Sequence, residues 1–234
     1  MSSRPGLEIA CRGKLLLRRE SVRFQGARKG ARRLLFASDL HLSGPWTERP
    51  AVQLAELAEA ERPDAVLLGG DLADSRSGLP RLEALVRRLG RTAPVLAVSG
   101  NHDSIPGVRR VQEAVQQGGG LWLRGRPVSL PGISANGEVR AEGARTAVLC
   151  AHDPSVWPAA RAAGYPVVLA GHLHGLQWVL FCRGGRMYPG AWLWRWNGPR
   201  FDAPDSTLLV SSGVSDTFPL RWRCPREALL CELS

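Results

Sequence analysis

The chain of 234 residues lacks any apolar stretch near the roughly 20 residues that a membrane-spanning helix needs. Its basic N-terminus is not followed by an apolar segment, which argues against a secretory signal. Cysteine is scarce, and the five cysteines are widely spread and never form a Cys-x-x-Cys pair. This pattern disfavours a disulfide framework and a thiolate metal site. We therefore expect a cytoplasmic protein with reduced thiols and no transmembrane segment.

The chain also lacks an internal repeat, a low-complexity tract and a linker that would mark a domain boundary. Its 44% hydrophobic and 22% charged residues are usual for a globular protein of ordinary size. We expect a single domain over residues 1–234. Its parts are basic N-terminal strands (1–33), a core that carries the sequence motifs (34–174) and C-terminal strands (175–234).

Acidic residues are few near the N-terminus. Residues 1–33 contain ten Lys/Arg and two Glu, a net charge of +8 within the +10 of the whole chain. Such a segment attracts phosphate-rich partners, either nucleic acid or an anionic membrane. The simpler interpretation is a solvated hairpin, with residues 15–17 and 22–24 as its candidate paired strands.

Only five histidines are present, and all of them lie beside carboxylates or amides at the ends of short apolar runs. The motifs are Asp39-Leu40-His41, Asn101-His102-Asp103, His152-Asp153 and His172-Leu173-His174, with Gly70-Asp71 as a related motif without histidine. The runs cover residues 34–38, 65–68, 94–98, 146–150 and 167–170. A continuous apolar run of this length is typical of a strand buried on both faces. Ligands of α/β sheets bind where such strands end, so these motifs predict one shared metal site.

Amphipathic patterns predict the helices between these strands. Apolar residues recur at helical spacing over 50–61, 79–89 and 108–117, and a further helix is expected over 155–163. Gly90 is placed to end the second helix. The alternation of strand and helix is typical of a parallel α/β half. Further short strands are expected at 121–123, 128–130, 178–181, 207–210 and 228–231.

A site for two metal ions needs a carboxylate that bridges ions roughly 3.5–4 Å apart. Asp71 is the natural bridge, because it stands alone after a glycine in the middle of the set. Imidazole, carboxylate and amide oxygen together suit Mn, Fe, Zn or Co and disfavour Ca. We therefore predict two divalent metal ions, with Mn as the first candidate. One ion takes Asp39, His41 and His174, and the other takes Asn101, His152 and His172.

The predicted chemistry is attack on phosphorus by a bridging water, which two such ions deprotonate near neutral pH. His102 adjoins Asn101 and is placed to stabilise the developing charge or to protonate the leaving group. Asp103 and Asp74 are both candidates for orienting His102. Asp74 is the weaker candidate, since an Asp at a strand end is as often a helix cap. His102 and Asp103 are the predicted catalytic residues.

The motifs from residue 34 to residue 174 closely resemble those of the calcineurin-like metallophosphoesterases, in the same order and with similar gaps. Residues 219–221 and 225–227 look, more weakly, like the C-terminal signature of the YkuE-type bacterial branch. The resemblance implies an α/β fold, a four-layer α/β/β/α sandwich of two mixed sheets. It also implies the ligand roles given above and hydrolysis of a small phosphodiester or pyrophosphate.

Two departures from the family pattern lie beside the last histidines. The family usually has Thr and Gly where this chain has Leu173 and Leu176. Neither residue is a ligand, so metal binding should survive. We expect the loop that lines the substrate pocket to be altered.

Three questions stay open at this stage. The chain could be a nuclease recruited by its basic N-terminus, or a metal-binding scaffold without catalysis on the same fold. Trp192, Trp194 and Trp196 would share one face of a strand and form an apolar wall for a lipid or nucleobase, or touch a membrane interface. Packing in the core or in a dimer is the simpler interpretation of this stripe. The oligomeric state does not follow from the sequence.

Overall fold

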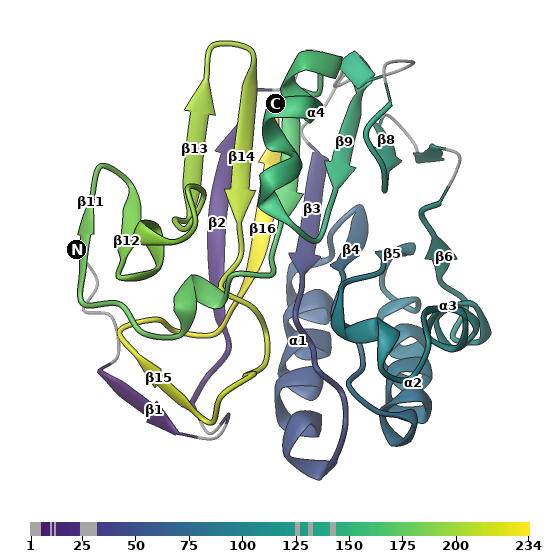
Figure 1. Cartoon of the computed structure of the whole chain (residues 1–234). Coiled ribbons are helices and arrows are strands. Elements are labelled where there is room, and N and C mark those ends of the chain that lie inside the picture. Colours follow the sequence, from purple (N-terminus) through teal and green to yellow (C-terminus); the bar gives the residue numbers. More distant parts are fainter. Residues whose placement is uncertain are drawn as a thin grey trace.

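The computed structural model describes residues 6–9, 11, 13–23, 32–124, 127–130, 133–140 and 144–234. Two six-stranded sheets form its centre (Figure 1). In spatial order, the first sheet consists of β2 (Leu16–Val22), β16 (Glu227–Leu233), β3 (Arg32–Ala37), β4 (Ala65–Gly69), β5 (Val95–Val98) and β6 (Leu121–Trp122). The second consists of β13 (Arg200–Ala203), β14 (Ser206–Val210), β10 (Val167–Ala170), β9 (Ala147–Cys150), β8 (Ile133–Asn136) and β7 (Val128–Leu130).

Both sheets are mixed. The strands from β3 to β6 run parallel, while β16 is antiparallel to β3 and parallel to β2. In the second sheet β8, β9, β10 and β14 are parallel, and the edge strands β7 and β13 are antiparallel to their neighbours. The carboxyl ends of the parallel strands therefore lie at one edge of each sheet.

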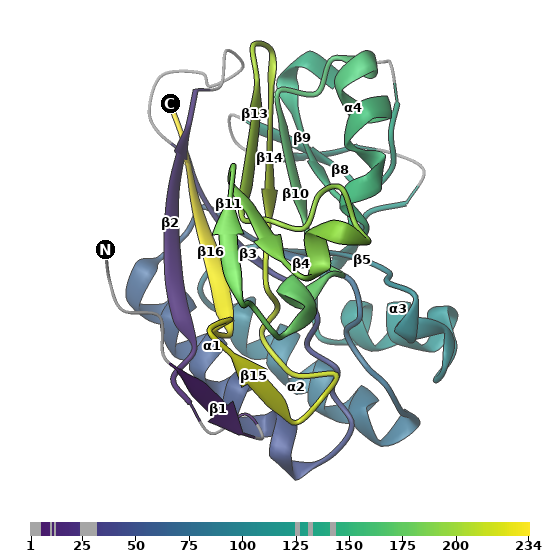
Figure 2. The same ribbon diagram turned by 60° about the vertical axis from the view of Figure 1, so that its left-hand side comes forward.

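Four helices cover the outer faces of the sheets. Helices α1 (Glu48–Glu61), α2 (Leu79–Leu89) and α3 (Val108–Gln117) pack on the first sheet, and α4 (Trp157–Ala163) packs on the second. Figure 2 shows α4 on the side away from α1 and α2. The predicted ranges 79–89 and 108–117 match α2 and α3 at both ends, and α1 and α4 each differ from prediction by two residues at the start. Helix α2 is capped by Gly90 as expected.

Alternate residues of each buried strand enter different cores, because successive side chains of a strand point to opposite faces. In β3, Leu35 and Ala37 pack against the helices, whereas Leu34 and Phe36 pack between the two sheets. A third core lies between the second sheet and α4. The layer order is thus helix, sheet, sheet, helix, which confirms the predicted four-layer sandwich.

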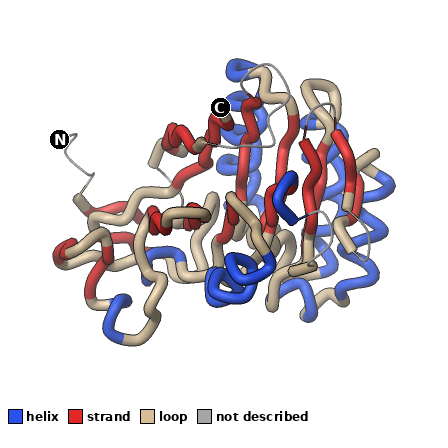
Figure 3. The backbone as a smooth tube through the Cα atoms, turned by 90° about the horizontal axis from the view of Figure 1, so that it is seen from above, coloured by secondary structure: helices blue, strands red, loops and turns tan. Residues whose placement is uncertain are grey.

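Two small ribbons lie beside the sheets. Strand β1 (Leu7–Ile9) pairs with β15 (Leu220–Trp222), and β11 (Phe181–Arg183) pairs with β12 (Arg186–Tyr188). Seen from above, the ribbons form the side of the molecule that the helices leave uncovered (Figure 3). They bring the N-terminal segment next to residues from the last quarter of the chain.

Three sequence predictions are wrong. Residues 16–22 form one strand that pairs with β16, so 15–17 and 22 are not paired strands of a hairpin; Phe24 lies outside the described residues. The strand expected at 178–181 begins only at Phe181. Residues 192–196 form no strand, because a short 3-10 turn (Gly190–Trp192) and further turns send the indoles in different directions.

The basic N-terminal segment is partly neutralised within the chain. Four of its arginines form ion pairs: Arg18 with Glu20 and Glu227, Arg19 with Glu61, Arg32 with Asp64, and Arg33 with Glu61 and Glu232. Less positive charge is thus left for a partner than the composition predicts. Among the described residues, no helix has both the length and the apolarity needed to cross a bilayer.

Candidate metal centre

The predicted ligands meet where the two sheets present the carboxyl ends of their parallel strands. Asp39 and His41 follow β3, Asp71 follows β4, and Asn101 follows β5. From the second sheet, His152 follows β9, and His172 and His174 follow β10. Backbone hydrogen bonds join these turns: Asp39 N donates to Gly70 O at 2.9 Å, and Gly171 N donates to His152 O at 2.9 Å. His172 N donates to Asp39 Oδ1 at 3.2 Å between the two sheets, and His102 N, beside Asn101, donates to Asp71 Oδ1 at 2.8 Å. All seven predicted ligands thus belong to one connected set of turns.

The backbone is strained at these turns. Ten non-glycine residues in the described part of the chain have a positive φ, and five of them are predicted ligands. A left-handed conformation costs a residue other than glycine about 1 kcal/mol or more. Such strain persists where the surrounding structure holds the side chain in a required position. The five residues are Asp39 (φ 58°), His41 (φ 46°), Asp71 (φ 52°), His172 (φ 72°) and His174 (φ 48°).

Asp39, His41 and His174 form the first donor cluster. His174 Nε2 lies 3.1 Å from His41 Nε2 and 3.3 Å from Asp39 Oδ1. The ligand atoms of all three residues lie within 4.8 Å of one another. Burial alone would raise the pKa of Asp39, but the neighbouring His174, His152 and His41 lower it below its ordinary value. The carboxylate is therefore ionised and ready to bind a cation.

The second donor cluster is centred on His152. His152 Nε2 lies 2.9 Å from Asn101 Oδ1, 3.1 Å from His172 Nδ1 and 3.3 Å from Asp71 Oδ2. His152 Nδ1 donates to Gly69 O at 2.9 Å, since a carbonyl can only accept. This bond leaves Nε2 as the ligand atom of the neutral ring. Without a metal, burial opposes the charge of His152, but Asp71 and Asp39 raise its pKa to about 9, and the protonated ring in turn lowers the pKa of Asp71 to about 2 against the effect of burial. Metal binding through Nε2 would displace that second proton of His152.

Asp74 lies between the two histidines of the first sheet. Its Oδ1 accepts from His41 Nδ1 at 2.8 Å and lies 3.2 Å from His102 Nδ1. The bond to Nδ1 turns Nε2 of His41 toward the first cluster, an arrangement common around metal-bound histidines. The 3-10 turn that follows has Ser75 as its N-cap, without a side-chain capping bond, so Asp74 does not act as a helix cap.

Asp103 occupies a different position from the one considered in the sequence. Its buried carboxylate accepts from Leu72 N at 2.8 Å, Ala73 N at 3.0 Å and Gly100 N at 2.8 Å. Burial raises the pKa of Asp103 to about 6, against the effect of these hydrogen bonds. Asp103 thus ties the turn after β4 to the turn after β5. Asp74 is the carboxylate that faces the His102 ring.

Two glycines allow the turns to approach the ligands. A Cβ at Gly100 would lie 2.1 Å from Asp71 Oδ1, and one at Gly171 would lie 2.5 Å from Asp39 Oδ2. Both distances are far below van der Waals contact. These positions therefore have no room for a side chain while the carboxylates keep their places.

Arg221 is a site residue that sequence reasoning missed. It is almost fully buried, pairs with Asp216, and its Nη2 lies 3.3 Å from His174 Nδ1. Because arginine only donates, Nδ1 accepts here, and the proton of the neutral ring lies on Nε2. For the neutral ring to bind a metal through Nε2, its proton must lie on Nδ1 instead, and the contact with Arg221 must then change. The only signal in the sequence was the Pro-Leu-Arg motif at 219–221, which indicated a branch of the family and no role.

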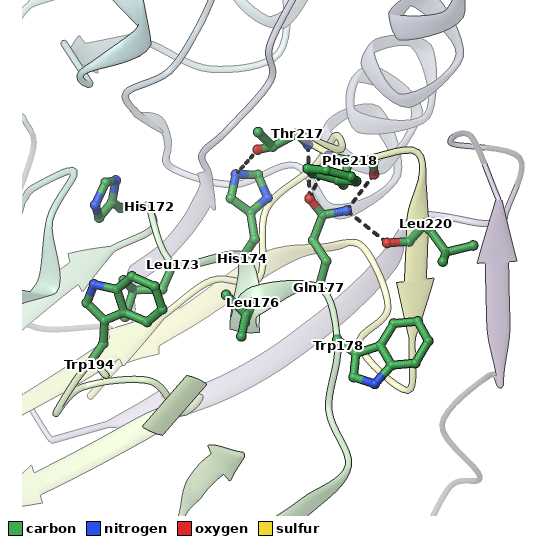
Figure 4. A pocket seen from close by; sticks show the side chains of 10 residues that line it. All are labelled: His172, Leu173, His174, Leu176, Gln177, Trp178, Trp194, Thr217, Phe218 and Leu220. Atoms are coloured by element: carbon green, nitrogen blue, oxygen red, sulfur yellow. Dashed lines mark hydrogen bonds between the residues drawn. The ribbon is translucent and has the colours of Figure 1, made fainter. Parts of the chain in front are cut away.

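A groove of about 390 Å³ opens beside the metal centre, and His172 and His174 are among the residues that line it (Figure 4). Its walls come from residues 173–178, Trp194 and the loop 217–220. Leu173 and Leu176, the two departures from the family pattern, both line it. Trp194 lines it as well, whereas Trp196 packs against Trp157 and Phe201.

The donor set suits a divalent transition metal. Imidazole nitrogens, carboxylates and one amide oxygen converge in two clusters, and each cluster combines at least one carboxylate with two histidines. Such mixed N and O ligands are typical of Mn, Fe, Zn and Co sites. None of the five cysteines, all in the described part of the chain, forms a disulfide.

Comparison with known proteins agrees with this geometry. The family profile of the calcineurin-like phosphoesterases matches residues 32–176. The uncharacterized metallophosphoesterase YkoQ of Bacillus subtilis (strain 168) is 25% identical over 167 residues, which are 62% of this chain and 61% of YkoQ. This chain therefore spans about three fifths of the length of that relative.

Two solved structures are similar at a lower level. A phosphoesterase from E. coli, Yfce, has 18% identity and a TM-score of 0.41, and the match covers 79% of this chain and 81% of Yfce. The phosphopantetheinyl hydrolase PptH from Mycobacterium tuberculosis has 13% identity and a TM-score of 0.47, over 81% of this chain and 94% of PptH. Similarity this low says nothing about substrates. The family profile covers more than half of the chain, and the chain belongs to the calcineurin-like phosphoesterases, a family of metal-dependent phosphoric ester hydrolases.

Proposed function

We propose that this protein hydrolyses a phosphodiester or pyrophosphate with two divalent metal ions, Mn being the first candidate. The observation that carries the proposal is the pair of donor clusters at one rim. Asp39, His41 and His174 would hold one ion, and Asn101, His152 and His172 the other, with Asp71 shared. When bound, two such ions lower the pKa of a water molecule and offset the charge of the phosphate.

The protein's own contribution to the reaction is placement and proton transfer. His102 is partly exposed, with 30% of its side chain accessible, and its ring lies edge-on against His41 with centroids 4.8 Å apart. From there His102 can donate a proton to the leaving oxygen, while Asp74 orients its ring. Asp103 acts indirectly, by holding the two turns together.

The test uses purified protein of known metal content and bis-p-nitrophenyl phosphate with Mn. Asp71→Ala and His174→Ala should abolish turnover and reduce the bound metal. Asp205→Ala is the matched control, because Asp205 is an exposed carboxylate that pairs with Arg161 of α4 and is not among the predicted ligands. Protein that is fully loaded with metal but hydrolyses no phosphoester would overturn the proposal.

A variant without His102 distinguishes an enzyme from a scaffold without catalysis. Loss of His102 should slow substrates with poor alkoxide leaving groups more than p-nitrophenyl esters, whose leaving group needs little protonation. A scaffold without catalysis predicts instead that His102→Ala changes no function of the protein in the cell.

Other expectations from the sequence stay proposals. Strands from both ends of the chain share the core between the sheets, which supports a single domain. The absence of disulfides supports a reducing, cytoplasmic location. A nuclease recruited by the basic N-terminus has little support, because Arg18, Arg19, Arg32 and Arg33 already have carboxylate partners. The oligomeric state and the branch within the family stay open.

A further inference from the structure

The groove beside the metal centre is apolar almost throughout. Apart from the two histidines, its polar lining side chains are Gln177, Thr217 and the indole N–H groups. The rest of the wall is aliphatic or aromatic: Leu173, Leu176, Trp178, Trp194, Phe218 and Leu220. A group that continues from a phosphate at the metal centre into this groove would therefore meet a hydrocarbon surface.

Both polar atoms of the Gln177 side chain form hydrogen bonds within the protein. Its Oε1 accepts from Thr217 N at 3.1 Å and Phe218 N at 2.9 Å, and its Nε2 donates to Phe218 O at 2.7 Å and Leu220 O at 3.3 Å (Figure 4). Thr217 Oγ1 is turned toward His174 Nε2, at 3.1 Å. Few side-chain groups thus remain to form hydrogen bonds with a ligand. A nucleobase or a sugar would need such bonds. This lining favours an aliphatic occupant over a nucleotide.

Leu176 faces the groove at a conformational cost. Its φ is 60°, in the left-handed region that leucine rarely adopts, and it is 36% exposed. The family pattern has glycine here, which adopts this φ without strain. Such a conformation persists where the surrounding structure holds the residue in place, here beside the left-handed Gly175 and Gln177. At this position Leu176 extends the apolar wall.

The rim around the groove is apolar and aromatic as well. Trp192 (68% exposed), Leu193 (73%) and Phe218 (72%) are among the most exposed large apolar side chains of the described residues. Leu180 and Phe181 on the neighbouring ribbon are also exposed. Phe218 lines the groove itself, Leu193 and Trp192 directly precede the lining residue Trp194, and the Trp192 ring meets those of Phe181 and Tyr188. Exposed apolar residues gathered in this way mark a contact surface.

The segments that form the groove and its surroundings carry positive charge without acidic residues. Residues 154–201 and 217–226 contain no Asp or Glu. They contribute the exposed Arg183, Arg195 and Arg223, none of which pairs with a carboxylate of the described residues. Arg195 lies over the Trp196 ring, with Cζ 4.8 Å from the ring centroid. Tryptophan, leucine and unpaired arginine together suit the interface of an anionic bilayer, where indoles sit at the headgroup level and arginine meets phosphate.

We propose that this face docks on an anionic lipid bilayer, and that the groove receives the hydrocarbon part of a membrane phosphoester. The phosphoryl group of that lipid then lies at the metal centre, beside His172 and His174, which also line the groove. The substrate class rests on the proposed phosphoesterase function. The proposed docking on a bilayer is independent of that function.

Docking is tested by flotation of the intact protein with vesicles of phosphatidylglycerol or of phosphatidylcholine. Binding to the anionic vesicles alone is expected, and Arg183→Glu with Arg195→Glu should weaken it by at least about tenfold. Trp192→Ser with Leu193→Ser should also weaken it. The controls are Arg109→Glu, on an exposed part of α3, and Val52→Ser, on an exposed part of α1. The thermal midpoint and metal content of each variant verify folding.

Three outcomes overturn docking: no binding to either vesicle, equal losses in the control variants, or a dimer that the Trp192 and Leu193 changes convert to a monomer without any vesicle binding. In the last case a second copy of the chain covers the face. Sedimentation velocity on the same proteins detects it.

The groove is tested with p-nitrophenyl alkyl phosphodiesters of rising chain length, below their critical micelle concentrations. KM should fall by about fourfold for each buried methylene until the groove is filled, with little change in kcat. Leu176→Gly, which the backbone tolerates, should flatten this dependence. A KM independent of chain length overturns the groove assignment, whereas no turnover of any ester overturns the proposed function and leaves the vesicle result standing.

Discussion

The metal centre and the apolar groove share His172 and His174 but are built in opposite ways. Side chains of the centre such as Asp39, His41 and Asp71 are buried, and each is held by several hydrogen bonds or charges. The groove is open, and its loop 217–220 is held to the centre chiefly by Gln177. A buried, redundantly held site preserves its geometry, while an open wall can change without disturbing the chemistry. We therefore expect the metal centre to determine the reaction and the groove to determine the substrate.

The strongest test removes the carboxylate that is proposed to be shared. In Asp71→Asn the side chain keeps its volume but loses the charge that would serve both ions, so turnover of bis-p-nitrophenyl phosphate should fall to background. The bound metal, measured by elemental analysis, should fall with it. Full activity in this variant would mean that Asp71 is not part of the centre.

Arg221 joins the two regions, and its loss should affect stability most. Arg221→Met leaves the buried carboxylate of Asp216 without its partner, which typically costs about 3–5 kcal/mol. Urea unfolding at neutral pH measures the cost. The double variant Arg221→Met/Asp216→Leu should recover part of it, because no unpaired charge then remains. A cost below about 1 kcal/mol would show that the pair is solvated.

Asp74 tests how far the centre depends on residues behind the ligands. Asp74→Asn weakens the bond that orients His41 and removes the charge beside His102, so metal affinity or activity should fall by about 10–100-fold. Metal titration separates the His41 effect, and leaving-group dependence separates the His102 effect. Ser75→Ala, one residue further, is the matched control.

A substitution of Gln177 tests the role of the groove, and it should reduce catalytic activity least. Gln177→Ala leaves the Thr217 and Phe218 amides without their acceptor, at a stability cost of about 1–3 kcal/mol. KM for long-chain esters should rise more than KM for bis-p-nitrophenyl phosphate, with metal content unchanged. An equal loss for all substrates would mean that the loop supports the centre as well as the groove.

Much of the fold could be predicted because its signals are local. Apolar runs at 65–68 and 167–170 became buried strands, and the stripe at 79–89 became α2 with the same bounds. The N-terminal hairpin failed, since β2 pairs with β16, whose residues lie more than 200 positions away. No local pattern encodes such a partner. The stripe at 192–196 failed because the turns around it, and not the spacing of the indoles, decide where each ring packs.

The sequence by itself predicted the candidate ligands that the structure brings together. Each ligand follows an apolar strand, and parallel strands bring such positions to one edge whatever the details of packing. Only the tertiary structure decided which carboxylate serves which histidine. It placed Asp74 beside His41 and His102, used Asp103 for backbone amides, and buried Arg221 against His174. Those contacts join residues as many as 47 positions apart, and the groove likewise needs two loops and Trp194 to meet in space.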